Sequence, residues 1–178
     1  MVGKMKDKAE LKLLEKIQAN QPWRSTWKAE LNGNPCIAKL IDCQDSSTCQ
    51  QLSASLCKQL RFSEILQPED VNTICLFNEK VELDNNQIAF CRNYVDGKPL
   101  DILLQEHEYD IREAVDLICK IAKVISKAHN TYKGSHGDLK PANIIIGTDG
   151  EPVIIDWDTM RVDASVINLK SKGKTITL

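Results

Sequence analysis

Four polar residues near the C-terminal end of the sequence have the types and the spacing needed to move a phosphoryl group. Lys140 follows Asp138 by two residues, Asn143 follows it by five, and Asp156 follows it by eighteen. Phosphoryl transfer from a nucleotide needs a carboxylate near the attacking hydroxyl, a cation near the moving phosphoryl and oxygen ligands for Mg²⁺. These four side chains supply one group for each of those tasks.

Each residue can be given a role in that chemistry. Asp138 is the candidate catalytic carboxylate, which would accept or orient the proton of the acceptor hydroxyl. Lys140 would contact the γ-phosphate, and Asn143 and Asp156 would bind Mg²⁺ through hard oxygen ligands. Any one of them alone is more commonly a turn residue, so the interpretation depends on their combination.

The combination resembles the protein kinase superfamily, whose catalytic loop reads His-Arg-Asp-Leu-Lys-Pro-x-Asn and whose metal-binding aspartate opens an Asp-Phe-Gly triplet. This resemblance covers about residues 15–160 and implies ATP and Mg²⁺ as cofactors. Lys140 is similar to the lysine of Ser/Thr protein kinases. Gly137, in place of Arg, and Trp157-Asp158, in place of Phe-Gly, resemble the small-molecule kinases of the aminoglycoside and choline type, so both subfamilies stay open.

Two further residues follow from the same resemblance. Lys39 lies on the strand predicted at 36–41, directly after Ala38, whereas the family's strand reads Ala-x-Lys with one residue between the two. The resemblance implies that Lys39 contacts the α- and β-phosphates. The family pairs this lysine with a glutamate on a helix, and Glu64 is the candidate for that glutamate. The alternative is that Glu64 is only a solvated surface charge. The family's glycine-rich phosphate loop would fall at residues 18–24, which contain no glycine.

The elements that must position these residues are mixed. Apolar spacing predicts both helices and strands. Asn32-Gly33 is the strongest hairpin signal in the sequence. The predicted fold class is α+β, a protein-kinase-like two-lobe fold, with a small antiparallel-sheet N-lobe (1–93), a hinge (94–100) and a reduced helical C-lobe (101–178). The predicted helices are 7–18, 46–66, 102–106 and 111–129, and the predicted strands are 24–31, 36–41, 74–77 and 87–91.

Composition excludes several other classes of function. The net charge of -2 over 178 residues provides no basic face for nucleic acid or anionic lipid. The sequence contains no secretory leader pattern and no apolar run long enough to span a membrane, which predicts a cytoplasmic protein, or one of a host cytosol if the chain is a secreted bacterial effector. The seven cysteines lack metal-ligand spacing and are expected to be reduced thiols.

Three functions therefore remain as hypotheses. The first is an ATP-dependent transfer of phosphate to Ser or Thr of a protein substrate, and the second is a kinase of small molecules. The third is a pseudokinase-like module that binds a regulatory protein partner with little catalysis. The apolar side of the helix predicted at 111–129 bears on the choice, because a fragment would leave it uncovered, whereas a minimal kinase would cover it with its C-terminal segment or a bound protein.

Overall fold

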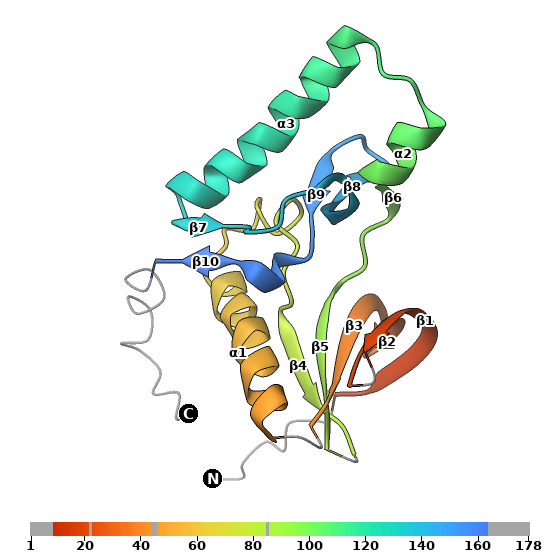
Figure 1. Ribbon diagram of the computed structural model, residues 1–178, viewed down its shortest axis with the longest axis vertical. Helices are drawn as coiled ribbons and strands as arrows, with labels where there is room; N and C mark the ends of the chain where they lie inside the picture. The colour runs from red at the N-terminus through yellow and green to blue at the C-terminus, as the bar shows by residue number, and fades with distance from the viewer. Residues whose placement is uncertain (1–8, 22, 44–45, 85, 164–178) are drawn as a thin grey trace. The chain divides into compact units, whose positions relative to one another are not determined.

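The computed structural model describes residues 9–21, 23–43, 46–84 and 86–163 (Figure 1). The chain is mixed α+β and divides into two compact units, Met1–Ser53 with Glu79–Tyr94, and Ala54–Asn78 with Val95–Leu178. The division after Tyr94 lies next to the predicted start of the hinge. Residues 54–78, which were predicted to belong to the N-lobe, fall in the second unit because Phe62 and Ile74 are buried in its core.

The first unit contains a five-stranded antiparallel sheet with the strand order β1-β2-β3-β5-β4. The predicted hairpin is confirmed, since β2 and β3 pair along their whole length around Asn32 and Gly33, whose positive φ angles of 51° and 79° suit a tight hairpin turn. The strands are β1 (Leu11–Gln21), β2 (Arg24–Leu31), β3 (Asn34–Asp42), β4 (Glu79–Glu82) and β5 (Gln87–Asn93).

Two predicted elements of the region assigned to the N-lobe are wrong. The segment predicted as a helix at 7–18 is the strand β1 over its described part, where Leu11 and Leu13 are half-buried and Lys12 and Leu14 are exposed. That alternation of two suits pairing with β2. The segment 74–77 forms only an isolated bridge from Ile74 to Ile154, and the strand that pairs with β5 is β4.

The cysteines of the first unit correct a further expectation. Cys36 and Cys91 are buried free thiols, and burial raises the pKa of Cys91 to about 12, which leaves it protonated and unreactive at neutral pH. Cys43, in contrast, is disulfide-bonded, so the prediction that all seven cysteines are reduced is wrong at this position. The spacing of cysteines along a sequence does not reveal which of them meet in space.

The second unit packs helices against short strands around Trp157, which is fully buried. It contains the C-terminal part of α1 (Ser46–Ser63), a three-stranded sheet with the order β6-β8-β9 and a pair formed by β7 and β10. Its other elements are β6 (Gly97–Pro99), α2 (Leu100–Glu106), α3 (Ile111–Asn130), β7 (Gly134–Ser135), η1 (Pro141–Asn143), β8 (Ile144–Gly147), β9 (Pro152–Ile154), η2 (Trp157–Thr159) and β10 (Arg161–Val162).

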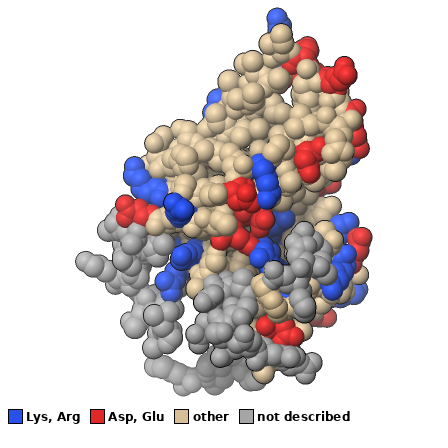
Figure 2. Space-filling view, in the orientation of Figure 1, with Lys and Arg blue, Asp and Glu red and all other residues tan. Residues whose placement is uncertain are grey.

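The long helix α3 begins with a capping box in which the Asp110 side chain accepts from the Glu113 backbone and the Glu113 side chain accepts from the Asp110 backbone. One side of α3 packs into the core. A neighbouring side exposes a line of apolar residues, Ile111 (86% exposed), Val115 and Ile118, which we call the outer stripe. The surface over α3 carries few charged side chains on the face shown in Figure 2.

Among the described residues, nothing covers the outer stripe, and the segment 164–178 that was considered for this role lies outside them. The spacing of the stripe, four residues and then three, is the spacing that helices use to pack against one another. No helix within the described ranges is both long enough and apolar enough to cross a membrane.

Candidate functional site

The β8–β9 hairpin and the loop that precedes it bring the candidate residues together within the second unit. The loop after β7 carries Asp138 and Lys140, and η1 ends at Asn143, directly before β8. The chain after β9 returns to this loop, since the Ile155 amide donates to the Asn143 carbonyl at 2.9 Å. Asp156 is therefore placed one residue from a direct hydrogen bond to the loop that carries the other three candidates.

Asp138 and Lys140 form an ion pair in which Lys140 Nζ lies 2.6 Å from Asp138 Oδ2. Both side chains are about half exposed. The hydrogen bond from Lys140 holds the pKa of Asp138 below its ordinary value, and the same bond raises the pKa of Lys140, with a smaller contribution from the charge of Asp156. Asp138 is thus kept ionised, as a group that must accept a proton or a hydroxyl hydrogen requires.

Asn143 is buried, and its amide group faces Asp138. Its Nδ2 donates to the Asp138 carbonyl at 2.8 Å and approaches Asp138 Oδ2 at 3.4 Å. With the nitrogen oriented toward Asp138, the oxygen Oδ1 is the atom that Asn143 offers to a cation. The sequence motif predicted both residues, and the structure adds that one orients the other.

His136 holds the loop through hydrogen bonds at both of its ring nitrogens. The Asp138 amide donates to His136 Nδ1 at 3.2 Å, so Nε2 carries the hydrogen and donates to the Ile155 carbonyl at 2.8 Å. The buried ring also packs against Trp157, with ring centroids 4.7 Å apart. Both ring nitrogens are therefore engaged in holding the loop.

Gly137 is required by its backbone conformation and by its neighbour. Its φ of 86° is one that residues with a side chain rarely adopt, and a Cβ placed there would lie 2.5 Å from the Thr159 carbonyl oxygen. Thr159 is fixed in turn, because its hydroxyl donates to the His136 carbonyl at 3.1 Å. The residue that separates this loop from the His-Arg-Asp pattern is therefore one that arginine could not replace without moving the backbone.

Asp156 occupies an unusual backbone position at the start of η2. Its φ and ψ of 60° and 55° are in the left-handed region, which aspartate tolerates better than most residues. The Trp157 indole anchors the following turn by donating to the Ile154 carbonyl at 2.9 Å. A strained conformation held by a buried tryptophan is typical of a position where the direction of a side chain matters.

The other two predicted residues are placed as follows. Lys39 lies in the first unit on β3, buried, opposite Thr26 on one side and Phe90 on the other. Glu64 lies one residue beyond the end of α1 and is exposed. The roles that the resemblance implied for them, a phosphate contact and an ion pair between the two, stay predictions.

Sequence reasoning missed two residues of α1 that reach the site. Gln59 is buried and donates from Nε2 to Asp158 Oδ1 at 3.0 Å, and the Ser55 hydroxyl donates to the Asp158 carbonyl. Serine and glutamine in the polar sequence of α1 gave no signal of function. Their spacing of four residues, which places them on one side of a helix, was the only indication available.

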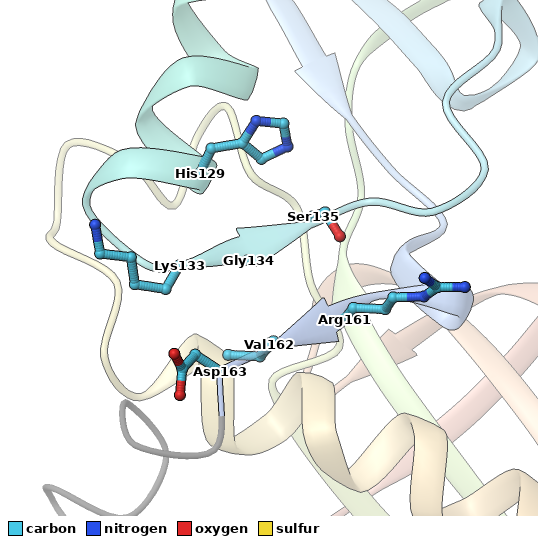
Figure 3. A pocket seen from close by; sticks show the side chains of 7 residues that line it. All are labelled: His129, Lys133, Gly134, Ser135, Arg161, Val162 and Asp163. Carbon is cyan, nitrogen blue, oxygen red and sulfur yellow. The ribbon is translucent and has the colours of Figure 1, made fainter.

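A shallow hollow lies elsewhere on the second unit, at the end of α3 and along β7 and β10 (Figure 3). Figure 3 shows that the side chains of Lys133 and Arg161 point in opposite directions, so its cations do not converge on one ligand atom. His129 is exposed at its rim. We assign no chemistry to this hollow.

The oxygens of Asn143 and Asp156 are of the kind that Mg²⁺ takes from proteins. No group of three or more His, Cys, Asp or Glu side chains suitable for a metal ion occurs in the part of the chain that the structure describes. Mg²⁺ commonly takes one or two protein oxygens and completes its shell with water and phosphate. Asn143 Oδ1 and the Asp156 carboxylate provide two such oxygens on adjoining segments.

Comparison with known proteins gives limited similarity. No protein-family model matches the chain. A relative from Caenorhabditis elegans, the dual specificity mitogen-activated protein kinase kinase mek-2, is 30% identical over 76 residues. That match spans 42% of this chain and 20% of the relative, so this chain is similar to a fifth of that kinase. The similarity is kinase-like and partial.

The Asp138–Lys140 pair leads to a prediction about pH. In Lys140→Met the pKa of Asp138 is expected to rise toward its ordinary value, because the hydrogen bond that lowers it is removed. The carboxylate would then become protonated at a higher pH than in the native protein. Titration of the Asp138 carboxyl carbon by NMR measures the change, with Lys133→Met, an exposed lysine outside the site, as the control. An unchanged pKa in Lys140→Met would contradict the ion pair.

Proposed function

We propose that the chain is an ATP-dependent, Mg²⁺-requiring phosphotransferase that transfers the γ-phosphate to Ser or Thr of a protein. The observation that supports this most directly is the cluster in which Asn143 contacts Asp138, Lys140 contacts Asp138, and Ile155 joins the segment of Asp156 to Asn143. The partial similarity to a protein kinase kinase is consistent with it.

In this proposal each side chain has one task. Asp138 Oδ1, the oxygen that neither Lys140 nor Asn143 contacts, accepts the hydrogen of the acceptor hydroxyl. Lys140 moves its ammonium group toward the γ-phosphate as negative charge develops there. Asn143 and Asp156 would hold Mg²⁺, which when bound would supply the charge that neutralises the nucleotide phosphates.

A second candidate is the phosphorylation of a small molecule, and one observation favours it. Gly137 has a backbone conformation and a contact with Thr159 that exclude the arginine of the protein kinase loop. Glycine at this place is a feature shared with aminoglycoside and choline kinases, whereas Lys140 is shared with Ser/Thr protein kinases. The acceptor therefore has to be determined by experiment.

The test uses the full chain with labelled ATP and Mg²⁺ in three parallel reactions: alone, with a generic Ser/Thr protein substrate, and with a mixture of aminoglycosides and amino alcohols. Label on Ser or Thr that disappears when EDTA is added is the expected result. Label on the small molecules alone would support the second candidate. If calorimetry on well-folded protein detected no binding of Mg²⁺ and nucleotide, both candidates would be overturned.

A further inference from the structure

Gln59 is a polar residue in an apolar setting, since only 1% of its surface is exposed. A buried amide is destabilising unless both of its ends find partners. Gln59 Nε2 donates to Asp158 Oδ1 at 3.0 Å, and Gln59 Oε1 accepts from the Phe77 amide at 3.4 Å. The Gln59 side chain therefore links the Phe77 backbone to the Asp158 carboxylate, which is 99 residues from Gln59 in the sequence.

A second residue of α1, Ser55, also makes a hydrogen bond to Asp158. Ser55 lies four residues before Gln59, on the same side of α1, and its hydroxyl donates to the Asp158 carbonyl. One residue of η2 is thus held through both its main chain and its side chain. Asp158 follows the candidate metal-binding residue Asp156 by two positions, inside the turn that Asp156 begins.

The direction of the Asp156 side chain depends on that turn. Asp156 is in the left-handed region, and three of the contacts that hold the turn after it are those of Trp157 with the Ile154 carbonyl, of Thr159 with the His136 carbonyl, and of Asp158 with Gln59 of α1. The first two contacts lie within the β9–η2 segment or the adjacent loop. The third is the contact that ties the turn to α1, which is distant in sequence.

We propose that Gln59, assisted by Ser55, is a positioning residue that acts through Asp158 to hold the Asp156 carboxylate in the direction that accepts Mg²⁺. This inference rests on the proposed function. Gln59 has no contact with the reacting atoms in this role. Its effect is on the metal requirement, through the orientation of the turn.

The hydrogen-bond pattern can be reversed without changing the shape of either side chain. In Gln59→Glu two carboxylates face one another, and the Mg²⁺ concentration for half-maximal nucleotide binding is expected to rise about tenfold, the equivalent of one unfavourable contact. In the double variant Gln59→Glu with Asp158→Asn, the new amide donates to the new carboxylate, and the Phe77 amide keeps its acceptor. The Mg²⁺ requirement should return to within about threefold of the native value.

The measurements are Mg²⁺-dependent nucleotide binding by calorimetry, with thermal unfolding recorded for each variant. Gln67→Glu, which adds the same charge on an exposed glutamine beyond α1, is the matched control and should leave the Mg²⁺ requirement unchanged. A native protein that fails to bind Mg²⁺ and nucleotide would remove the proposed function itself. If the native protein binds them and Gln59→Glu has the same Mg²⁺ requirement as Gln67→Glu, only the positioning role is overturned.

A purely structural role would give a different result. It would lower the unfolding temperature of Gln59→Glu and leave the Mg²⁺ requirement of the folded protein unchanged, and that result would overturn the inference. Ser55→Ala provides an independent arm, because it removes one hydrogen bond and adds no charge. It is expected to raise the Mg²⁺ requirement about threefold, in line with the loss of one neutral hydrogen bond. An unchanged requirement in Ser55→Ala and in the folded Gln59→Glu protein would exclude the role of α1.

Discussion

Asp156→Asn is expected to lower the rate of phosphoryl transfer by about a thousandfold or more, since neutralisation of charge on the phosphates is a large part of catalysis in such reactions. Asparagine has the same shape as aspartate and tolerates the left-handed conformation seen at this position, so the fold should be retained. The loss of rate should be accompanied by weaker binding of Mg²⁺ and nucleotide. Rates are measured under single-turnover conditions with labelled ATP.

The control for this substitution is Asp149→Asn in the turn between β8 and β9. Asp149 Oδ1 accepts from the Glu151 amide at 3.0 Å, a bond that the oxygen of an asparagine can also accept. The same chemical change at a nearby turn should therefore leave the rate within about twofold of the native value. If Asp156→Asn kept more than a tenth of the native rate, Asp156 would not be a metal ligand, and the assignment of this site would fail.

Gly137→Arg, which restores the arginine of the protein kinase loop, is expected to destabilise the second unit and reduce activity. Any side chain at this position costs about 1–2 kcal/mol for the left-handed conformation. Its Cβ would also meet the Thr159 carbonyl oxygen at 2.5 Å, so the loop or η2 has to move. Because Asp138 follows directly, that movement displaces the carboxylate that we propose as the catalytic group. Urea unfolding and the transfer rate are the two measurements.

Two alanine substitutions separate the causes of this effect. Gly150 has a similar φ of 79°, and a Cβ placed there would have nothing within 4 Å. Gly150→Ala therefore reports the conformational cost alone, whereas Gly137→Ala reports the same cost plus the contact with Thr159. Gly137→Ala should be the more destabilising by at least about 1 kcal/mol. Equal losses of unfolding free energy would show that the contact with Thr159 is relieved without consequence.

Local patterns in the sequence predicted the parts of the fold that local physics determines. The turn at Asn32-Gly33 needs positive φ angles, and the apolar spacing of α3 needs only 3.6 residues per turn. The strand β1 was predicted wrongly, because the apolar residues Leu11, Leu13, Leu14 and Ile17 fit a helix as well as a strand. The segment is a strand because it pairs with β2, and such a long-range contact cannot be predicted from the periodicity of apolar residues.

The candidate site divides in the same way. Asp138, Lys140 and Asn143 are close in sequence, so their spacing nearly fixes their geometry, and Asp156 follows through one short hairpin. Gln59 could not be found from the sequence, since its partner lies 99 residues away and glutamine on a helix is ordinary. The requirement for Gly137 was also hidden, because it comes from the position of Thr159 as well as from the backbone.

The outer stripe of α3 affects how the protein behaves when it is handled. Burying these three branched side chains against another molecule lowers the free energy, because it removes apolar surface from water. Sulfate strengthens this hydrophobic association, and urea weakens it. Among the residues described, no charge on the stripe itself opposes such an encounter. Purification in a kosmotropic buffer therefore favours clustering of molecules through this helix, and a chaotropic buffer favours their dispersal.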